Sequence, residues 1–474
     1  MRCLVAVLLL VSAARAQPAL GETQFPNSGA PEAQEPFLQG LLLLHSFEYD
    51  DARLAFQHAR RLDPGFAMAA WGEAMTHNHP VWQQQDRDAA RAALAGVSTE
   101  GLTARERDYL ASLDVLYGDG DKETRDDRYA EALRLLAADY PDDLDARSLY
   151  ALALLGTAHE GRDVATYMQA AAVAEDVFAA NPRHPGAAHY LIHAYDDPVH
   201  APLGLRPARV YADIAPAASH ALHMPSHIYF ALGLWEEVRV MNQRSYDAAK
   251  RGTDARGDAL NGHGWHALWW WHYAATQLGD PALADSLLAV AETHHAEAPT
   301  GPSMAHVVRI RAQHALGVDA PAAILSRPPP PDDAGVTTLA IDALARGLAM
   351  RSQGRDIQDE IAHLERAIDA AGEVPWAARA AALMLTAAHR TAEGDAESAL
   401  ALLQEAARLE TDAPLTFGPP APVQTANEAL GIALLASCRA DEAADAFRAS
   451  LARQTHRRQS VDGLAAAGAP RDCP

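Results

Sequence analysis

Histidine is concentrated in one part of the chain. Ten of the 22 histidines lie between residues 184 and 272, where an even distribution would place about four. They are His184, His189, His193, His200, His220, His223, His227, His263, His266 and His272. Imidazole is the commonest neutral metal ligand and the usual general base near neutral pH. The excess therefore indicates a metal site or acid–base chemistry.

The spacing of five of these histidines favours metal binding. His189 and His193, in the run HYLIH, lie one helical turn apart. His220, His223 and His227, in the run HALHMPSH, repeat the three- and four-residue spacing that places side chains on one helix face. Two helices whose histidine faces converge would form a polydentate metal site. The alternative is that a helical protein holds these imidazoles as hydrogen-bonded core residues.

The donor types limit the metal. Nitrogen and carboxylate ligands without a nearby thiolate suit Zn²⁺, Cu²⁺, Fe²⁺, Ni²⁺ or Mn²⁺ and argue against Cu⁺ or an iron–sulfur cluster. More histidines are present than one ion can bind, so the site holds one or two ions. Zinc with a bound water would support hydrolysis, whereas iron or copper would support redox chemistry. The sequence leaves this choice open.

Other residues are candidates for additional ligand or acid–base roles. These are Glu73, His77, His79, His159, Asp196, Asp197 and His266. Trp71 and Trp269 are candidate aromatic residues of a ligand groove, although a tryptophan at helical spacing is more often part of a core. His184 and His200 are expected in loops, outside the site.

The N-terminus has the pattern of a secretory signal peptide. Arg2 precedes an apolar run from residue 3 to 11, and Ala14-Arg15-Ala16 resembles a cleavage site. We therefore expect residues 1–16 to be removed and the protein to be exported, to the periplasm or beyond. No other run approaches the roughly twenty apolar residues of a membrane-spanning helix.

Charge and cysteine content narrow the function further. The net charge of −23 disfavours nucleic acid as a partner, because phosphate backbones are also negative. Cys438 and Cys473 would remain after export, either free or joined in a disulfide. Neither arrangement suggests a thiol enzyme.

Helices must position the histidines, because alanine and leucine dominate the composition. The segment from Gly40 to Pro64 resembles a tetratricopeptide repeat (TPR): Gly40, Ala52, Phe56 and Pro64 fall at repeat positions 8, 20, 24 and 32, where the family favours such residues. The register recurs at Gly431, Ala443 and Phe447 near the C-terminus. The resemblance implies an all-α, right-handed superhelical solenoid of antiparallel helix pairs.

Two proline-containing segments interrupt the repeats. Residues 17–35 are expected to be a disordered lead-in. Residues 327–336, which begin RPPPPDD, are expected to form a stiff linker. The predicted organisation is therefore an N-terminal TPR-like array over residues 36–326, which holds the histidine-rich groove, and a C-terminal array over residues 337–474.

The TPR resemblance also implies where the histidines point. In this family the first helix of each repeat lines a concave groove through positions 2, 5, 9, 12 and 13. A repeat starting at Pro185 places His189, His193, Asp196 and Asp197 at positions 5, 9, 12 and 13. A repeat starting at Ser219 places His220, His223 and His227 at positions 2, 5 and 9. All seven would face one groove.

The chain is similar to exported bacterial TPR proteins that carry an HPGAAHYxIH run together with an HMPSHIY run. That resemblance implies a fold and a site but no particular reaction. The leading hypothesis is a metalloenzyme whose groove binds one or two divalent metals and acts on a small organic or peptide ligand. The alternatives are a periplasmic protein–protein interaction scaffold without catalysis and a metal storage or delivery protein.

Overall fold

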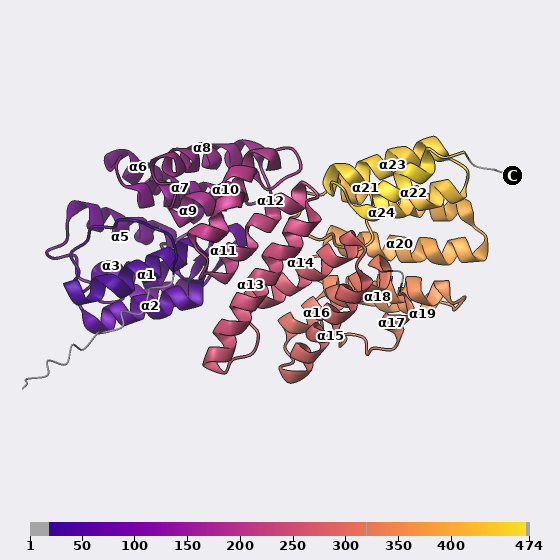
Figure 1. Ribbon diagram of the computed structural model, residues 1–474, viewed down its shortest axis with the longest axis horizontal. Helices are drawn as coiled ribbons and strands as arrows, with labels where there is room; N and C mark the ends of the chain where they lie inside the picture. The colour runs from indigo at the N-terminus through magenta and orange to yellow at the C-terminus, as the bar shows by residue number, and fades with distance from the viewer. Residues whose placement is uncertain (1–18, 319, 471–474) are drawn as a thin grey trace, which may run out of the picture.

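The fold is an all-α, TPR-like helical solenoid, seen in a computed structural model that describes residues 19–318 and 320–470 (Figure 1). Apart from one two-stranded hairpin, every regular element among these residues is a helix. The predicted signal peptide, residues 1–16, and Cys473 lie outside the described residues. The predicted all-α class is confirmed.

The N-terminal helices form the indigo and purple part of Figure 1. A short antiparallel hairpin, β1 (Asn78–His79) and β2 (Gln84–Gln85), interrupts them around η2 (Pro80–Trp82). The helices are η1 (Pro31–Ala33), α1 (Gln34–His45), α2 (Tyr49–Leu62), α3 (Ala67–Met75), α4 (Arg87–Leu94), α5 (Ala104–Leu116), α6 (Lys122–Asp139), α7 (Leu144–Gly156), α8 (Val164–Ala180), α9 (Pro185–Tyr195) and α10 (Ala201–Ile214).

The middle helices connect this part to the C-terminal half, and α13 and α14 lie between the two in Figure 1. They are α11 (Ser219–His223), α12 (Pro225–Ala231), α13 (Trp235–Arg256), α14 (Gly262–Leu278), α15 (Pro281–Glu297), α16 (Gly301–Gly317) and α17 (Ala322–Leu325). The C-terminal helices are α18 (Val336–Ser352), α19 (Gln358–Ala370), α20 (Trp376–Glu393), α21 (Ala396–Asp412), α22 (Ala426–Ala436), α23 (Ala440–Arg453) and α24 (Arg458–Ala467).

Large aromatic residues packed against glycines hold consecutive helices together. Phe56 is fully buried, and a Cβ atom added at Gly40 or Gly72 would lie 2.9 Å or 2.3 Å from its ring. Phe447 occupies the same place near the C-terminus, where a Cβ atom added at Gly431 would lie 2.8 Å from its ring. The small residue at repeat position 8 and the aromatic at position 24 therefore interlock at both ends of the chain, as the repeat pattern predicts.

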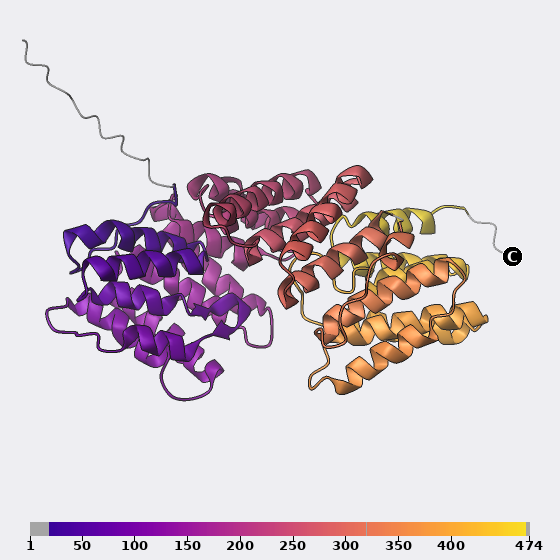
Figure 2. The same ribbon diagram turned by 90° about the horizontal axis from the view of Figure 1, so that it is seen from below.

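The halves on either side of the proline-rich linker pack against each other. One buried apolar cluster contains Val308 and Ala312 of α16 together with Ile341 and Ala345 of α18. The C-terminal segment also returns to the first half, where Arg457 donates to the hydroxyl of Tyr273 at 3.0 Å. Residues 327–336 therefore join two parts that share a core. Figure 2 shows this close approach from below.

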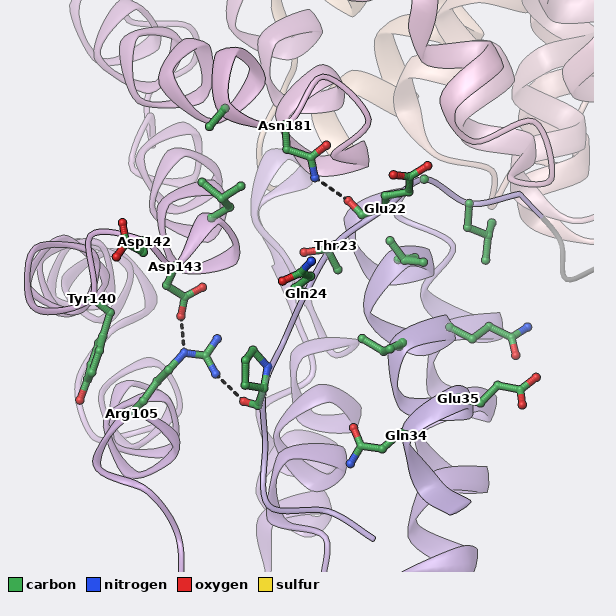
Figure 3. A pocket seen from close by; sticks show the side chains of 18 of the residues that line it. Glu22, Thr23, Gln24, Gln34, Glu35, Arg105, Tyr140, Asp142, Asp143 and Asn181 are labelled. Atoms are coloured by element: carbon green, nitrogen blue, oxygen red, sulfur yellow. Dashed lines mark hydrogen bonds and ion pairs between the residues drawn. The ribbon is translucent and has the colours of Figure 1, made fainter. Parts of the chain in front are cut away.

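The described part of the lead-in is ordered along the first array, in contrast to the expectation from its composition. Leu20 and Phe25 are buried, with 4% and 3% of their surface exposed. Figure 3 shows two of the contacts that hold this segment: Arg105 donates to the Pro26 carbonyl at 2.9 Å, and the Asn181 amide donates to the Glu22 carbonyl at 2.9 Å. Two buried apolar side chains and these hydrogen bonds offset the cost of ordering the segment.

Two further expectations concern the membrane and the cysteines. Within the described ranges, no helix has both the length and the apolar character needed to cross a bilayer. Cys438, at the end of α22, is disulfide-bonded.

Candidate metal centre

Six histidines form two compact groups. They come from α9, from α11 and α12, and from α14. The first histidine cluster consists of His189, His193 and His220; the second histidine cluster consists of His223, His227 and His266. Within each cluster, one ring nitrogen from every residue lies within 4.8 Å of the others. The sequence expectation that α9 and the run HALHMPSH bring their histidines together is therefore met, and α14 contributes the sixth.

The run HALHMPSH forms two short helices, and its three histidines divide between the two clusters. α11 ends at His223 and α12 begins at Pro225, whose ring nitrogen has no proton to donate to a preceding turn. His220, near the start of α11, points to the first cluster, whereas His223 and His227 point to the second. The sequence predicts a single shared face; the structure divides that face between two neighbouring sites.

Hydrogen bonds fix the orientation of two rings in the second cluster. The Nδ1 atom of His227 lies 2.6 Å from Oδ2 of Asp196, so Nδ1 carries a proton and donates it to the carboxylate. The Nδ1 atom of His223 lies 2.6 Å from Oδ1 of Asn242, whose amide nitrogen donates to the Val238 carbonyl at 2.8 Å. Both rings therefore keep a lone pair on Nε2 when neutral.

These two lone pairs point at each other. The Nε2 atoms of His223 and His227 lie 3.0 Å apart, and neither ring has a proton left to place between them when neutral. Two acceptor atoms at this distance repel each other unless a cation lies between them. Histidine ligands of metals have this same arrangement, in which the second ring nitrogen donates to a carboxylate or carbonyl group.

The first cluster also brings two Nε2 atoms together, and the hydrogen bonds orient one of its rings, His189. Nδ1 of His189 donates to the His45 carbonyl at 2.7 Å, and its Nε2 atom lies 3.1 Å from Nε2 of His193. Nε2 of His220 is buried and has no hydrogen-bond partner. Because burial of a polar atom without a partner is costly, this nitrogen is a candidate ligand atom.

Burial keeps most of these rings neutral. Loss of hydration lowers the pKa of His189 to about 3. Burial, reinforced by neighbouring imidazoles, also lowers the pKa values of three further cluster histidines well below 6.5: His193, His220 and His223. The pKa of His266 shifts in the same direction for the same reason. Neutral imidazole is the form in which histidine can serve as a metal ligand.

The two clusters are adjacent, and one aromatic ring supports each. The rings of His193 and His227, one from each cluster, have centroids 6.0 Å apart. The Phe47 ring contacts all three imidazoles of the first cluster, at centroid distances from 4.2 to 5.7 Å. Trp270 contacts all three of the second cluster, at 4.6 to 5.5 Å.

Phe47 has a strained backbone that its repeat position explains. Its φ angle is +57°, in the left-handed region that bulky residues rarely occupy. It stands at repeat position 15, where another repeat has Gly233 with φ +68°. Phenylalanine in place of glycine at such a position costs about 1–3 kcal/mol. The ring that contacts the first cluster is therefore carried by a strained residue.

A third group of ionisable residues differs from the two histidine clusters. His45, Asp145 and His184 form the aspartate-centred cluster, in which all three side chains are fully buried. Nδ1 of His184 accepts the Ala187 N–H at 3.2 Å, so its Nε2 carries the proton and donates to Asp145. His184 was expected in a loop outside the site; it does lie in the turn before α9, which it caps, but it is a buried member of this cluster.

Every polar atom of the aspartate-centred cluster has a protein partner. Nε2 of His45 donates to Asp145 at 2.8 Å, and Nδ1 of His45 accepts from the Tyr190 hydroxyl at 2.9 Å. The Thr23 hydroxyl donates to the second carboxylate oxygen at 2.7 Å. Burial alone would raise the pKa of Asp145, but the hydrogen bonds from the two histidines lower it below its usual value. A metal ion would have to displace these bonds, so the group is a structural network.

Several other candidates from the sequence do not join either histidine cluster. Glu73 is an ion-pair partner of Arg60 at 2.5 Å, and His77 does not belong to any potential ligand group among the described residues. His79 stacks on the Tyr49 ring at 4.0 Å. His159 pairs with Asp127 at 3.1 Å near the surface.

The remaining candidates have supporting or core positions. Asp196 orients His227, whereas Asp197 binds Arg162 at 2.5 Å. Trp71 is fully buried in the core and not in a groove. Trp269 is partly buried, with its ring 5.6 Å from that of His266.

Sequence reasoning missed the residues that orient the clusters. Asn242 lies on α13, and Glu48, at the start of α2, accepts from the His220 backbone N–H at 2.8 Å. Asp145 lies on α7, far from the histidine-rich segment in the sequence. No local pattern marks these residues, because each acts across a contact between helices that are distant in the sequence.

A large cavity lies elsewhere, between the lead-in, α1 and the turn before α7 (Figure 3). Its volume is about 1700 Å³, and its lining includes Leu38, Leu42, Tyr140 and Asp142. None of the clustered histidines lines it. The cavity and the histidine clusters are therefore separate features.

Among known proteins, the chain is similar only in fold to the solved structures described below. No protein-family model matches the chain, and no curated protein matches it. Solved structures with similar architecture include the APC/C hetero-tetramer Cut9-Hcn1, with 14% identity over 94% of this chain and 78% of that chain and a TM-score of 0.38. The human IFIT1 dimer with m7Gppp-AAAA has 11% identity over 95% and 92% of the two chains and a TM-score of 0.39. The P58(IPK) TPR domain has 12% identity over 92% and 97%, with a TM-score of 0.23.

Proposed function

We propose that this chain is an exported metalloprotein that binds two transition-metal ions side by side, one in each histidine cluster. The observation that carries the proposal is the pair of Nε2 atoms of His223 and His227, 3.0 Å apart, on rings whose protons are already donated through Nδ1. Two nitrogens bound to one ion at about 2.0–2.1 Å would lie about 3.0–3.4 Å apart. The observed spacing fits this requirement.

The number of ligands favours catalysis or ligand binding over a structural role. Each cluster offers three imidazoles. Structural zinc sites usually have four protein ligands, whereas catalytic sites keep a position open for water or substrate. We therefore propose that the two ions act together on a small ligand. Storage or delivery of metal would not need two adjacent sites whose ligands are oriented by buried hydrogen bonds.

The first experiment is metal analysis of protein purified without a histidine tag. We expect two transition-metal ions per chain, falling to one in His193→Gln and one in His223→Gln. His272→Gln is a matched control, because His272 is fully buried but bonds to Gln313 and His314 outside both clusters. Folded wild-type protein that binds no metal at micromolar concentration would refute the proposal.

A second candidate function concerns the separate cavity in Figure 3. TPR-like helical solenoids are suited to protein interaction, and a cavity of about 1700 Å³ is large enough for a peptide segment. We propose that this cavity binds a peptide or protein partner independently of the metals. Peptides selected from a random library should lose binding to Leu38→Arg but not to His193→Gln. Equal binding to Leu38→Arg would place the interaction elsewhere.

A further inference from the structure

We propose that the two ions are copper and that the reduced pair binds one molecule of dioxygen between the clusters. This inference rests on the proposed function, because it requires an ion in both clusters. It adds the identity of the metal and the class of ligand.

The donor set favours copper. All six cluster residues are imidazoles, and no carboxylate or thiol of the described residues belongs to either cluster. Among divalent first-row metals, copper binds a given nitrogen site most tightly. Magnesium, calcium and manganese prefer oxygen ligands, which these clusters lack. The absence of thiolate ligands argues against a site that holds only Cu⁺. For two copper ions that alternate between Cu⁺ and Cu²⁺, the balance of charge around the ions matters more.

Two carboxylates next to the clusters set that balance. Asp196 accepts a hydrogen bond from the second cluster, and Glu48 accepts one from the backbone of the first. A third carboxylate, Asp197, is paired with Arg162 at 2.5 Å. Two Cu⁺ ions would match the two remaining negative charges. Two divalent ions alone would leave two uncompensated positive charges in a buried site, which is unfavourable.

Oxidation by dioxygen preserves the balance. Each Cu⁺ gives one electron to the bound O₂, which becomes O₂²⁻ between two Cu²⁺ ions. The oxygen–oxygen bond loses one bond order but does not break, and no proton or other reductant is consumed. The added dianion compensates the two added positive charges, so the pocket has the same net charge before and after. Removal of dioxygen reverses the step.

The surroundings of the clusters suit a small apolar ligand. Five of the six histidines are at most 7% exposed, and His266 is partly buried. The rings of Phe47 and Trp270 support the clusters. Two further rings stand nearby: Trp82 lies 6.0 Å from His220, and Phe417, from the C-terminal half, lies 6.4 Å from His227. Such a buried, aromatic environment admits a diatomic molecule more readily than a peptide.

The test is anaerobic loading of the full-length protein with two equivalents of Cu⁺, followed by exposure to O₂. We expect uptake of one O₂ per two copper ions, a new charge-transfer absorption band, and no electron paramagnetic resonance signal, because the two Cu²⁺ spins couple through the shared ligand. The band should disappear when O₂ is removed.

Single-cluster variants show whether both ions are needed. His193→Gln and His266→Gln should each bind one copper and give the resonance signal of an isolated Cu²⁺ after oxidation. Stoichiometric O₂ uptake should be lost in both and kept in His272→Gln. Circular dichroism establishes whether each variant is folded. If a variant does not fold, O₂ uptake by the wild-type protein alone tests the proposal.

The outcomes separate this inference from the proposed function. Two bound coppers without O₂ uptake would overturn the dioxygen inference and leave the two-ion site standing. Two bound zinc ions that copper cannot replace would also overturn the dioxygen inference and leave the two-ion site standing. Fewer than two ions of any metal would overturn both proposals.

Discussion

The two histidine clusters and the aspartate-centred cluster contain similar residues but have different chemistry. In the aspartate-centred cluster, protons and lone pairs alternate, so each donor meets an acceptor. In the second histidine cluster, the Nδ1 protons are directed outward to Asp196 and Asn242, and lone pairs meet lone pairs. Burial and residue type do not separate a structural network from a candidate metal site. The placement of the protons does.

Metal addition should produce the largest difference between these regions. An ion that binds only the folded protein stabilises it by about 4 kcal/mol at 1,000 times its dissociation constant. Two ions should therefore raise the free energy of unfolding by about 8 kcal/mol, and His193→Gln should lose about half of this increase. Urea unfolding with and without metal measures it. An increase of equal size in the variant would show that the first cluster binds no ion.

Removal of the central carboxylate should have the next largest effect. Asp145→Ala leaves the buried donors of His45, His184 and Thr23 without their acceptor, which we expect to cost about 3–5 kcal/mol. The number of bound metal ions should not change. The control is Asp127→Ala, because Asp127 is exposed and its pair with His159 contributes at most about 1 kcal/mol. Loss of one ion in folded Asp145→Ala would identify this cluster as a metal site.

Removal of a positioning carboxylate should have a smaller and local effect. Asp196→Asn weakens the hydrogen bond that orients His227, and we expect the metal affinity of the second cluster to fall about 10- to 100-fold. The first cluster should keep its affinity. Asp197→Asn is the matched control, since Asp197 binds Arg162 and no cluster histidine. Isothermal titration of both variants measures the two sites, and equal losses at both would contradict the assignment.

Acid should destabilise the metal-free protein gradually. Burial lowers the pKa of both His189 and His272 to about 3, below the unfolded value of 6.5. Between these values the unfolded chain binds more protons, so the stabilisation is complete above about pH 6.5 and is lost as the pH falls. Each such histidine contributes a slope of about 1.4 kcal/mol per pH unit.

The aspartate-centred carboxylate should respond in a lower range. The pKa of Asp145 is lowered in the folded state, so its contribution is lost only as the pH falls below about 4. Urea midpoints measured from pH 8 to about pH 2 test both expectations. A flat profile between pH 7 and pH 5 would show that the buried histidines take up protons in the folded state as readily as in the unfolded chain.

The sequence alone determined the helical class and five of the six clustered histidines. Both depend on local periodicity: glycine and phenylalanine at fixed repeat positions predict how paired helices pack, and a four-residue spacing predicts a common helix face. Gly40 against Phe56 and His189 beside His193 show that these short-range rules hold.

Only the tertiary structure decided how the histidines divide between the two clusters and which tautomers their hydrogen bonds favour. His220 and His223 both lie on α11 but belong to different clusters, and His223 is grouped with His227 of α12. The tautomers depend on Asn242 and on the His45 carbonyl, which belong to other helices. The same holds for His184, whose acceptor Asp145 lies 39 residues away. A hydrogen bond across a helix contact has no fixed sequence separation, so no spacing rule can predict it.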